Sequence, residues 1–348
     1  MAYVAIFIVK SQLASKLWLT QAAFVNTSIK QVAAAASRAA KRIDGVICKT
    51  PLVQSPVFSS ETGTDIYLKL ENLQHTGSFK LRGATNRLMT LSGEQRSNGC
   101  VTASSGNHGA AVACAMQKLE VSGVIFVPEQ TSSVKIEAIR SFGGDVRFFG
   151  SDGLETEQHA REFAEHNSMV YLSPYNDAEV IAGQATCGIE IAEQLPDVDA
   201  VFIAVGGGGL ASGVGSVLRR HNPGVKIYGC QPRASAIMAR SIEAGRIVDL
   251  PSDPTLSDGT AGGIEADAIT FELCRELIDE FILVSEEEIA NAMRLFINAH
   301  GQVIEGAAGV AIAAMLACPE LIAGKKVTVI VCGGNVSQET LESIQIDS

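Results

Sequence analysis

Short runs of β-branched and aliphatic residues alternate along the chain with longer, Ala-rich stretches of helical period. Runs of this kind predict the buried strands of parallel sheets, and the longer stretches predict the helices that cover them. The strands expected from the pattern are 66–70, 100–103, 124–127, 146–149, 201–205, 226–229, 281–284 and 327–331. The expected helices include 29–42, 110–119, 134–142, 154–166, 185–194 and 287–298. The alternation therefore predicts an α/β fold with parallel sheets between layers of helices.

No repeat or Pro/Gly/Ser-rich linker interrupts the sequence, so any domain boundary is expected where the chain crosses between packed units. The block 99–174 contains three strand–helix units and a final strand, and we expect it to form a small inserted α/β domain. The flanking segments 29–98 and 175–348 would then form the large domain. Residues 1–28 are interpreted as an N-terminal extension of unknown role. Their apolar start is interrupted by Lys10 too early for a membrane span, and no basic segment precedes it.

Composition narrows the function classes. Charged residues make up 19% of the chain, the formal charge is −11, and lysines and arginines are scattered, so neither a nucleic-acid surface nor a membrane surface is expected. The eight cysteines include no CxxC pair, and most lie in apolar runs. That usage is typical of reduced core cysteines in a cytoplasmic protein.

One lysine stands at a predicted strand-to-helix junction. In KLENLQHTGSFKLRGA (69–84), a strand ends near Leu70 and a helix begins around Ser78, which places Lys80 in the first helical turn. The positive end of the helix dipole disfavours an ammonium there and lowers its pKa. An amine that loses its proton readily is suited to covalent chemistry with a carbonyl group. Taken alone, the pattern also fits an ordinary solvated lysine.

Three further strand ends open into small residues, in VTASSGNHG (101–109), VFIAVGGGGLASG (201–213) and VCGGN (331–335). Such junctions leave main-chain N–H groups free to bind a carboxylate or phosphate, although each also fits a plain tight turn. A dinucleotide site is disfavoured, because the strand 226–229 is followed by Cys230, Gln231 and Pro232 and not by a carboxylate. Together with the Lys80 junction, these ends predict one crevice at the carboxyl edge of a sheet.

The blocks KLENLQHTGSFKLRGA, SSGNHG, PYNDAEVIAGQAT, GGGGLASG and CGGN occur in this order. They resemble the corresponding blocks of the threonine/serine dehydratases (ammonia-lyases) and serine racemases, which are pyridoxal-phosphate enzymes of fold type II. The resemblance extends from about residue 29 to the end. It implies a tryptophan-synthase-β-like fold, with two open parallel-sheet domains and the active site between them. It also implies pyridoxal 5′-phosphate as cofactor, a small amino-acid substrate, and a homodimer or homotetramer.

The resemblance further implies how individual residues hold the cofactor. Lys80 would bind it covalently, Phe79 would pack against the pyridine ring, and Asn107 would hydrogen-bond the ring 3′-oxygen. Cys332 would face the pyridine nitrogen, where many relatives carry serine, and Glu305 would lie near the ring. The phosphate would be bound by the main-chain N–H groups of Gly206, Gly207, Gly208, Gly209 and Leu210.

The same resemblance implies the substrate-binding and catalytic residues. Lys80 would move protons at the substrate Cα on one face, and in racemases the serine that matches Ser105 acts on the opposite face. The substrate carboxylate would be bound by the loop Ser105, Gly106, Asn107 and His108. Metal-dependent serine racemases carry carboxylates where this chain has Gln231 and Ile237, so no metal site is expected.

These assignments predict an ammonia-lyase. A thiol opposite the ring nitrogen cannot hold it protonated as a carboxylate would, so a Cα carbanion should be brief and β-hydroxyl loss should follow quickly. We expect L-threonine or L-serine to be converted to a 2-oxo acid and ammonia. A serine or aspartate racemase, or a dehydratase of 3-hydroxyaspartate or another hydroxy amino acid, remains open on the same scaffold. A non-catalytic, cofactor-binding regulatory paralogue is the alternative from another class.

Overall fold

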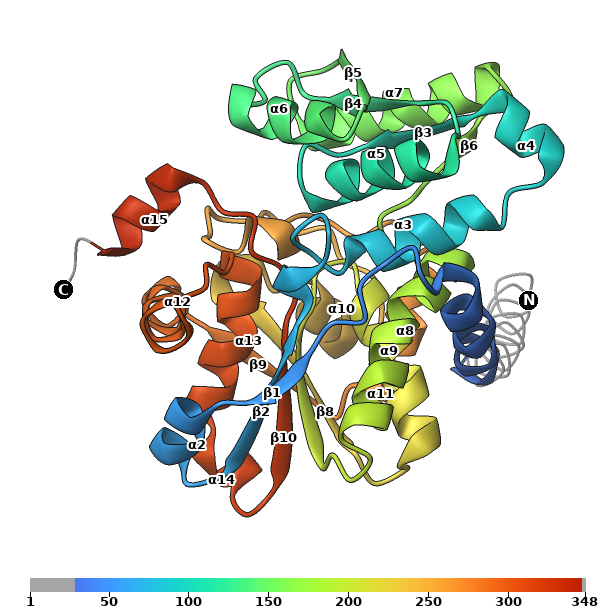
Figure 1. Cartoon of the computed structure of the whole chain (residues 1–348). Coiled ribbons are helices and arrows are strands. Elements are labelled where there is room, and N and C mark those ends of the chain that lie inside the picture. The colour runs from blue at the N-terminus through green and yellow to red at the C-terminus, as the bar shows by residue number, and fades with distance from the viewer. Residues whose placement is uncertain (1–28, 346–348) are drawn as a thin grey trace, which may run out of the picture.

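The computed structural model describes residues 29–345 and contains two open β-sheets, one above the other in Figure 1. The six-stranded sheet has the order β1-β2-β10-β7-β8-β9, and the four-stranded sheet has the order β5-β4-β3-β6. Neighbouring strands run parallel, except that β1 pairs antiparallel with β2. The architecture is therefore the α/β fold with parallel sheets that the hydrophobic pattern predicts.

The strands agree closely with the predicted ones. Their bounds are β1 Leu52–Gln54, β2 Asp65–Leu70, β3 Cys100–Ala103, β4 Gly123–Val127, β5 Asp145–Phe148, β6 Val170–Tyr171, β7 Ala200–Ala204, β8 Lys226–Pro232, β9 Glu280–Val284 and β10 Lys326–Val331. β8 extends beyond its predicted end, because Gln231 and Pro232 still pair with β9. β1 was not predicted, since three residues are too few to show a period.

Helices connect most of these strands. Residues 29–43 are helical, and the others are α2 Pro56–Thr62, α3 Lys80–Met89, α4 Gly93–Asn98, α5 Asn107–Leu119, α6 Ser133–Ser141, α7 Gly153–His166, α8 Ala178–Gln194, α9 Gly209–His221, α10 Ile237–Ala244, α11 Ile269–Leu277, α12 Glu286–His300, α13 Gly306–Ala317, α14 Pro319–Ile322 and α15 Gln338–Gln345. Three short 3-10 turns are η1 Glu71–Leu73, η2 Arg233–Ser235 and η3 Asp258–Thr260. Within residues 29–345, no helix combines the length and apolar character needed to span a membrane.

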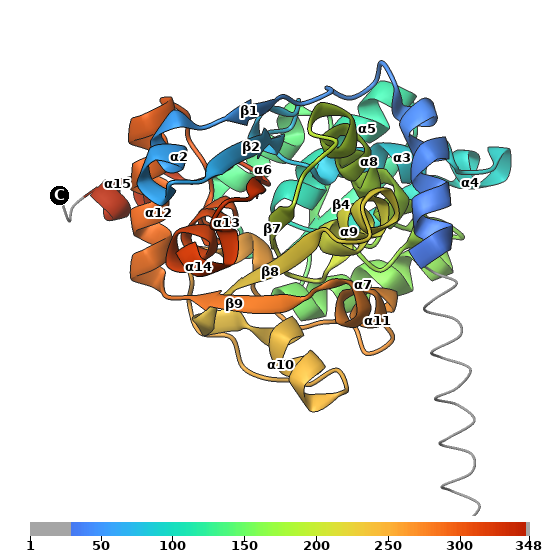
Figure 2. The same ribbon diagram turned by 90° about the horizontal axis from the view of Figure 1, so that it is seen from below.

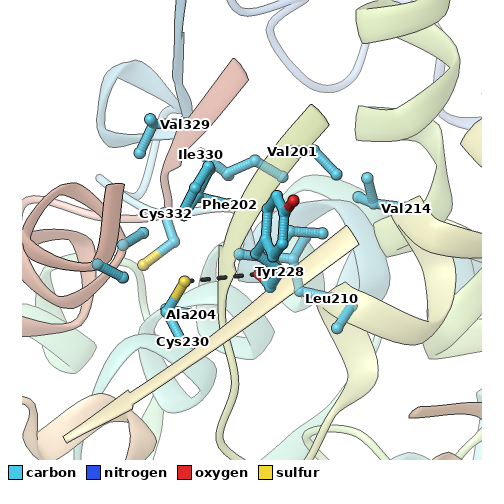
Figure 3. Packing of buried hydrophobic residues seen from close by; sticks show 14 of the residues in the cluster. Val201, Phe202, Ala204, Leu210, Val214, Tyr228, Cys230, Val329, Ile330 and Cys332 are labelled. Carbon is cyan, nitrogen blue, oxygen red and sulfur yellow. Dashed lines mark hydrogen bonds between the residues drawn. The ribbon is translucent and has the colours of Figure 1, made fainter. Parts of the chain in front are cut away.

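Helices cover both faces of the six-stranded sheet. Figure 2 shows α12, α13 and α14 on one side and α8, α9 and α11 on the other. The strand β7 is buried along its whole length, and its Phe202 packs beside Tyr228 of β8 in the apolar cluster drawn in Figure 3. Fully burying such a side chain contributes about 1.5–3 kcal/mol. The sheet is therefore a rigid support for the loops at its carboxyl edge.

The helix α3 lies between the two sheets (Figure 1). Its residues Leu81, Ala84 and Leu88 belong to the same buried cluster as Ala111 of α5 and Ile125 of β4. The helix that begins at Lys80 therefore rests on the smaller sheet. The four-stranded sheet lies inside the block 99–174, whose assignment as an inserted domain remains a prediction, and the proposed extension 1–28 lies outside the described residues.

Candidate active site

Four strand-end segments meet between the two sheets. β2, β10 and β7 are neighbours in the larger sheet, so the segments that follow them share one edge. The fourth segment, SSGNHG, follows β3 of the smaller sheet. The prediction of a single sheet edge is therefore wrong for SSGNHG. This segment follows β3, which pairs with β4 and β6 in the four-stranded sheet and not with the strands of the larger one.

Lys80 is the first residue of α3 and is half-buried at this junction. Its Nζ donates a hydrogen bond to the carbonyl oxygen of Pro174 at 3.1 Å and lies 5.3 Å from the centroid of the Phe79 ring. Burial lowers the pKa of Lys80 to about 8, although the nearby Cys332 and Glu305 act in the opposite direction. The position at a helix start is as predicted, and burial adds a cause of the low pKa that the sequence could not show.

The chain before Lys80 is attached to the loop that follows β10. The Phe79 N–H donates to the Cys332 carbonyl at 3.1 Å, and the Gly334 N–H donates to the Gly77 carbonyl at 2.9 Å. Gly77 has φ +71°, and a Cβ there would lie 2.6 Å from Oδ1 of Asn335, so both its conformation and its surroundings require glycine. These contacts fix the direction in which Lys80 leaves the turn.

A chain of polar side chains crosses from the larger sheet to the smaller one. Asn107 Nδ2 donates to both oxygens of Glu305, at 2.8 and 3.0 Å, and Asn335 Nδ2 donates to Asn107 Oδ1 at 2.7 Å. Burial raises the pKa of Glu305 to about 7. The thiol of Cys332, 3.9 Å from Glu305 Oε1, has its pKa raised well above the ordinary value, again by burial. Cys332 is therefore an uncharged group at neutral pH.

The glycine loop after β7 fits a bound phosphate. Gly208 has φ +83°, and α9 begins at Gly209 with no side chain capping its first turn. Among the described residues, none accepts a hydrogen bond from the N–H groups of Gly206, Gly207 or Gly208. A Cβ at Gly207 would lie 2.3 Å from the ring of Tyr175. Free N–H groups in a cradle without side chains are what the phosphate of the expected cofactor needs.

The four residues expected to bind the substrate carboxylate, in the loop before α5, differ in how accessible their side chains are. Ser105 is half-buried, and no described residue hydrogen-bonds its hydroxyl. Gly106 is the N-cap of α5 and provides no side chain, so the first N–H groups of the helix are free to bind an anion. His108, in contrast, is buried with Nε2 3.0 Å from the Leu172 carbonyl, and burial lowers its pKa to about 3. The imidazole is thus neutral and directed at Leu172, which leaves its main-chain N–H for the substrate.

Gln231, expected from the resemblance to stand where metal-dependent serine racemases carry a carboxylate, has both ends of its amide hydrogen-bonded. Gln231 Nε2 donates to the Val205 carbonyl, and its Oε1 accepts from the Ala239 N–H, each at 2.9 Å. Ile237 begins α10 and is buried. No group of three or more His, Cys, Asp or Glu side chains suited to a metal ion occurs in the described part of the chain. Independence from metal stays a prediction.

A buried ion network next to Lys80 was missed in the sequence. Arg82 is fully buried, with Nε 2.7 Å from Glu71 Oε2 and Nη1 2.6 Å from Glu190 Oε1. Lys69 Nζ lies 2.6 Å from the other oxygen of Glu190. The network joins β2, η1, α3 and α8. Its only sequence signal is the occurrence of Lys69, Glu71 and Arg82 inside the Lys80 block.

The chain was compared with known proteins. The family model for pyridoxal-phosphate dependent enzymes matches residues 43–333. The L-threonine ammonia-lyase of Thermotoga maritima is 41% identical over 306 residues, which is 88% of this chain and 76% of that protein. The catabolic L-threonine dehydratase TdcB of Escherichia coli K12 is 36% identical over 310 residues, covering 88% and 93% of the two chains.

Solved structures agree. A processed threonine deaminase isoform 2 from Solanum lycopersicum superposes with a TM-score of 0.87 at 36% identity and covers 91% of this chain and 92% of its own. Maize serine racemase superposes with a TM-score of 0.84 at 30% identity and covers 90% and 97%. The chain therefore belongs to the family of pyridoxal-phosphate dependent enzymes of fold type II and is similar over most of its length to threonine ammonia-lyases.

Proposed function

We propose that the protein is an ammonia-lyase that converts L-threonine or L-serine to the 2-oxo acid and ammonia. The observation that carries the proposal is the half-buried Lys80 amine at the start of α3, which donates to the Pro174 carbonyl beside the loop after β10 and has a pKa of about 8. Relatives named as threonine ammonia-lyases and threonine dehydratases support the choice of substrate. The homo-oligomeric assembly implied by the resemblance and the cytoplasmic location expected from the cysteine usage remain predictions.

Each part of the site has a separate task in this proposal. The N–H groups of Gly206 to Leu210 would hold the phosphate, and the N–H groups at the start of α5 would hold the substrate carboxylate. When bound, the cofactor supplies the electron sink that makes the substrate Cα–H acidic. The neutral amine of Lys80 removes the Cα proton. The uncharged Cys332 places no negative charge in the site, which favours rapid loss of the β-hydroxyl.

The test is a panel of hydroxy amino acids, assayed for 2-oxo acid, ammonia and D-isomer formation before and after treatment with a chelator. L-threonine or L-serine should give the fastest 2-oxo acid formation, and the chelator should have little effect because Gln231 is bonded on both sides. D-serine forming faster than pyruvate would support the racemase instead. Bound cofactor without any turnover would support the regulatory paralogue. An activity lost with the chelator and restored by magnesium would contradict metal independence.

Replacing Ser105 with alanine should retain the visible absorbance of the bound cofactor and lower activity by roughly 10²- to 10⁴-fold. The reason is that the Ser105 hydroxyl has no hydrogen-bond partner within residues 29–345 and lies in the loop at the start of α5. D-substrates and racemisation should be affected most. The matched control is Ser104→Ala, which removes only a 3.3 Å hydrogen bond from the Gly106 N–H and should keep most activity. Full activity in Ser105→Ala would make Ser105 a turn residue only.

A further inference from the structure

The segment 172–177 connects the smaller sheet to α8 and contacts the candidate active site twice. The Pro174 carbonyl accepts the hydrogen bond from Lys80 Nζ at 3.1 Å. The Tyr175 ring lies against the glycine loop, where a Cβ on Gly207 or Gly209 would come within 2.3 or 3.1 Å of Tyr175. The PYNDAEVIAGQAT block starts inside this connector, at Pro174. The position of the connector therefore affects both the Lys80 amine and the glycine loop expected to hold the phosphate.

Glu265 holds the connector at three points. Ser173 Oγ donates to Glu265 Oε1 at 3.1 Å, and Asn176 Nδ2 donates to Oε2 at 2.8 Å. The main-chain N–H of Glu265 donates to the Tyr175 hydroxyl at 2.9 Å. Only 17% of the Glu265 side chain is exposed, so water competes little for these bonds. The Glu265 carboxylate thus holds Ser173 and Asn176, and its main-chain N–H holds Tyr175 between them.

The same carboxylate reaches the smaller sheet. Arg161 of α7 places Nη2 2.9 Å from Glu265 Oε2 and also pairs with Glu157 on its own helix. Its guanidinium lies 4.1 Å from the centroid of the Tyr171 ring, at the end of β6. Because Arg161 is 40% exposed, this ion pair by itself contributes little stability. Its effect is on geometry, since it joins the helix over the smaller sheet to the residue that holds the connector.

We propose that Glu265 is a positioning residue that sets the place of the Lys80 amine through the connector and the Pro174 carbonyl. The inference rests on the function proposed above only in taking Lys80 as the reacting amine. A shift of the connector alters the hydrogen bond that holds Nζ and the wall of the phosphate cradle. Misplacing a reacting group by about 1 Å can lower a rate by roughly a hundredfold.

The test is Glu265→Gln in the holoenzyme. Glutamine keeps the shape and one oxygen, so Ser173 can still donate, but the amide nitrogen cannot accept from Asn176 or Arg161. The first measurement is the pH midpoint of the visible absorbance of the bound cofactor, which reports the Lys80 environment without any substrate. The charged or titratable groups that act on Lys80 are Glu305, Cys332 and the neutral His108, and the variant leaves all three in place. The midpoint should move, and kcat should fall about tenfold or more while KM changes less.

Glu157→Gln is the matched control, because it removes the other carboxylate of Arg161 and leaves the connector intact. It should keep the wild-type midpoint and kcat. A Glu265→Gln enzyme with the same midpoint and kcat as this control would overturn the proposal. If Glu265→Gln does not fold, Asn176→Ala removes the hydrogen bond to Glu265 from the connector side. A pH midpoint that stays unchanged in that variant would also overturn the proposal. Should no hydroxy amino acid be turned over while the midpoint still moves, the proposed function fails and the positioning role stands.

Discussion

Replacing Lys80 with alanine is expected to lower kcat by about 10⁴-fold or more, the scale seen when a reacting group is removed outright. The variant loses the amine that binds the cofactor and the base that acts at Cα. The Lys69 amine cannot take over, because it is held by Glu190 and the Thr50 carbonyl. The measurements are kcat and the visible absorbance of the bound cofactor, which should be absent.

Borohydride treatment of the wild-type holoenzyme, followed by peptide mapping, should place the cofactor on Lys80. The exposed Lys135 offers the control, since Lys135→Ala loses only an exposed ion pair with Asp258 and should stay fully active. A label on Lys69 or Lys135 would contradict the assignment. Since the neutral amine attacks the cofactor and the pKa of Lys80 is lowered to about 8, incorporation into cofactor-free protein should accelerate as pH rises and reach half of its maximum near pH 8.

Replacing Arg82 with methionine should lower the free energy of unfolding by about 3–5 kcal/mol, because it leaves a carboxylate buried without its partner. Glu71 is fully buried, and burial alone would raise its pKa, but Arg82 reverses this and lowers it. Without Arg82, Glu71 has to be buried as a charge or take up a proton, and both cost stability. Denaturant unfolding, followed at neutral pH, measures the difference.

Arg87→Met is the matched control on the same helix, since the ion pair of Arg87 with Asp177 is partly exposed and should be worth about 1 kcal/mol or less. The double variant Arg82→Met/Glu71→Gln should recover part of the lost stability, because it removes the unpaired charge. An Arg82→Met protein as stable as the control would show that the network contributes no net stability. In the wild type, the contribution of Glu71 is present above its unfolded pKa and is lost as the pH falls through the lower folded value.

The features that could be predicted from the sequence are those with a local signal. Apolar runs that end in glycine predicted β7 and β10, and the turn before Lys80 predicted the start of α3. β1 could not be predicted, because Leu52–Gln54 is a strand only through its pairing with β2. The same holds for the place of SSGNHG on a second sheet, which strand pairing decides and no local pattern records.

The parts of the site that were missed depend on contacts between distant positions. Arg82 meets Glu190, 108 residues further along the chain, and Ser173 meets Glu265 across 92 residues. In the sequence, such side chains look like the solvated faces of helices, since charged residues are mostly exposed. Only the folded chain shows that burial, and not solvent, surrounds Arg82.

The place of β10 has a consequence for how the protein matures on the ribosome. β10 lies between β2 and β7, so the nascent chain carries an open seam in its larger sheet until this late strand arrives. The Cys332 carbonyl that accepts from Phe79, beside the reacting lysine, is delivered by the same late segment. Domains generally form from the N-terminal side during synthesis. In this protein the larger sheet is complete only once β10 has been synthesised. The aldehyde of pyridoxal phosphate therefore meets an ordered pocket around Lys80 only after translation has passed β10.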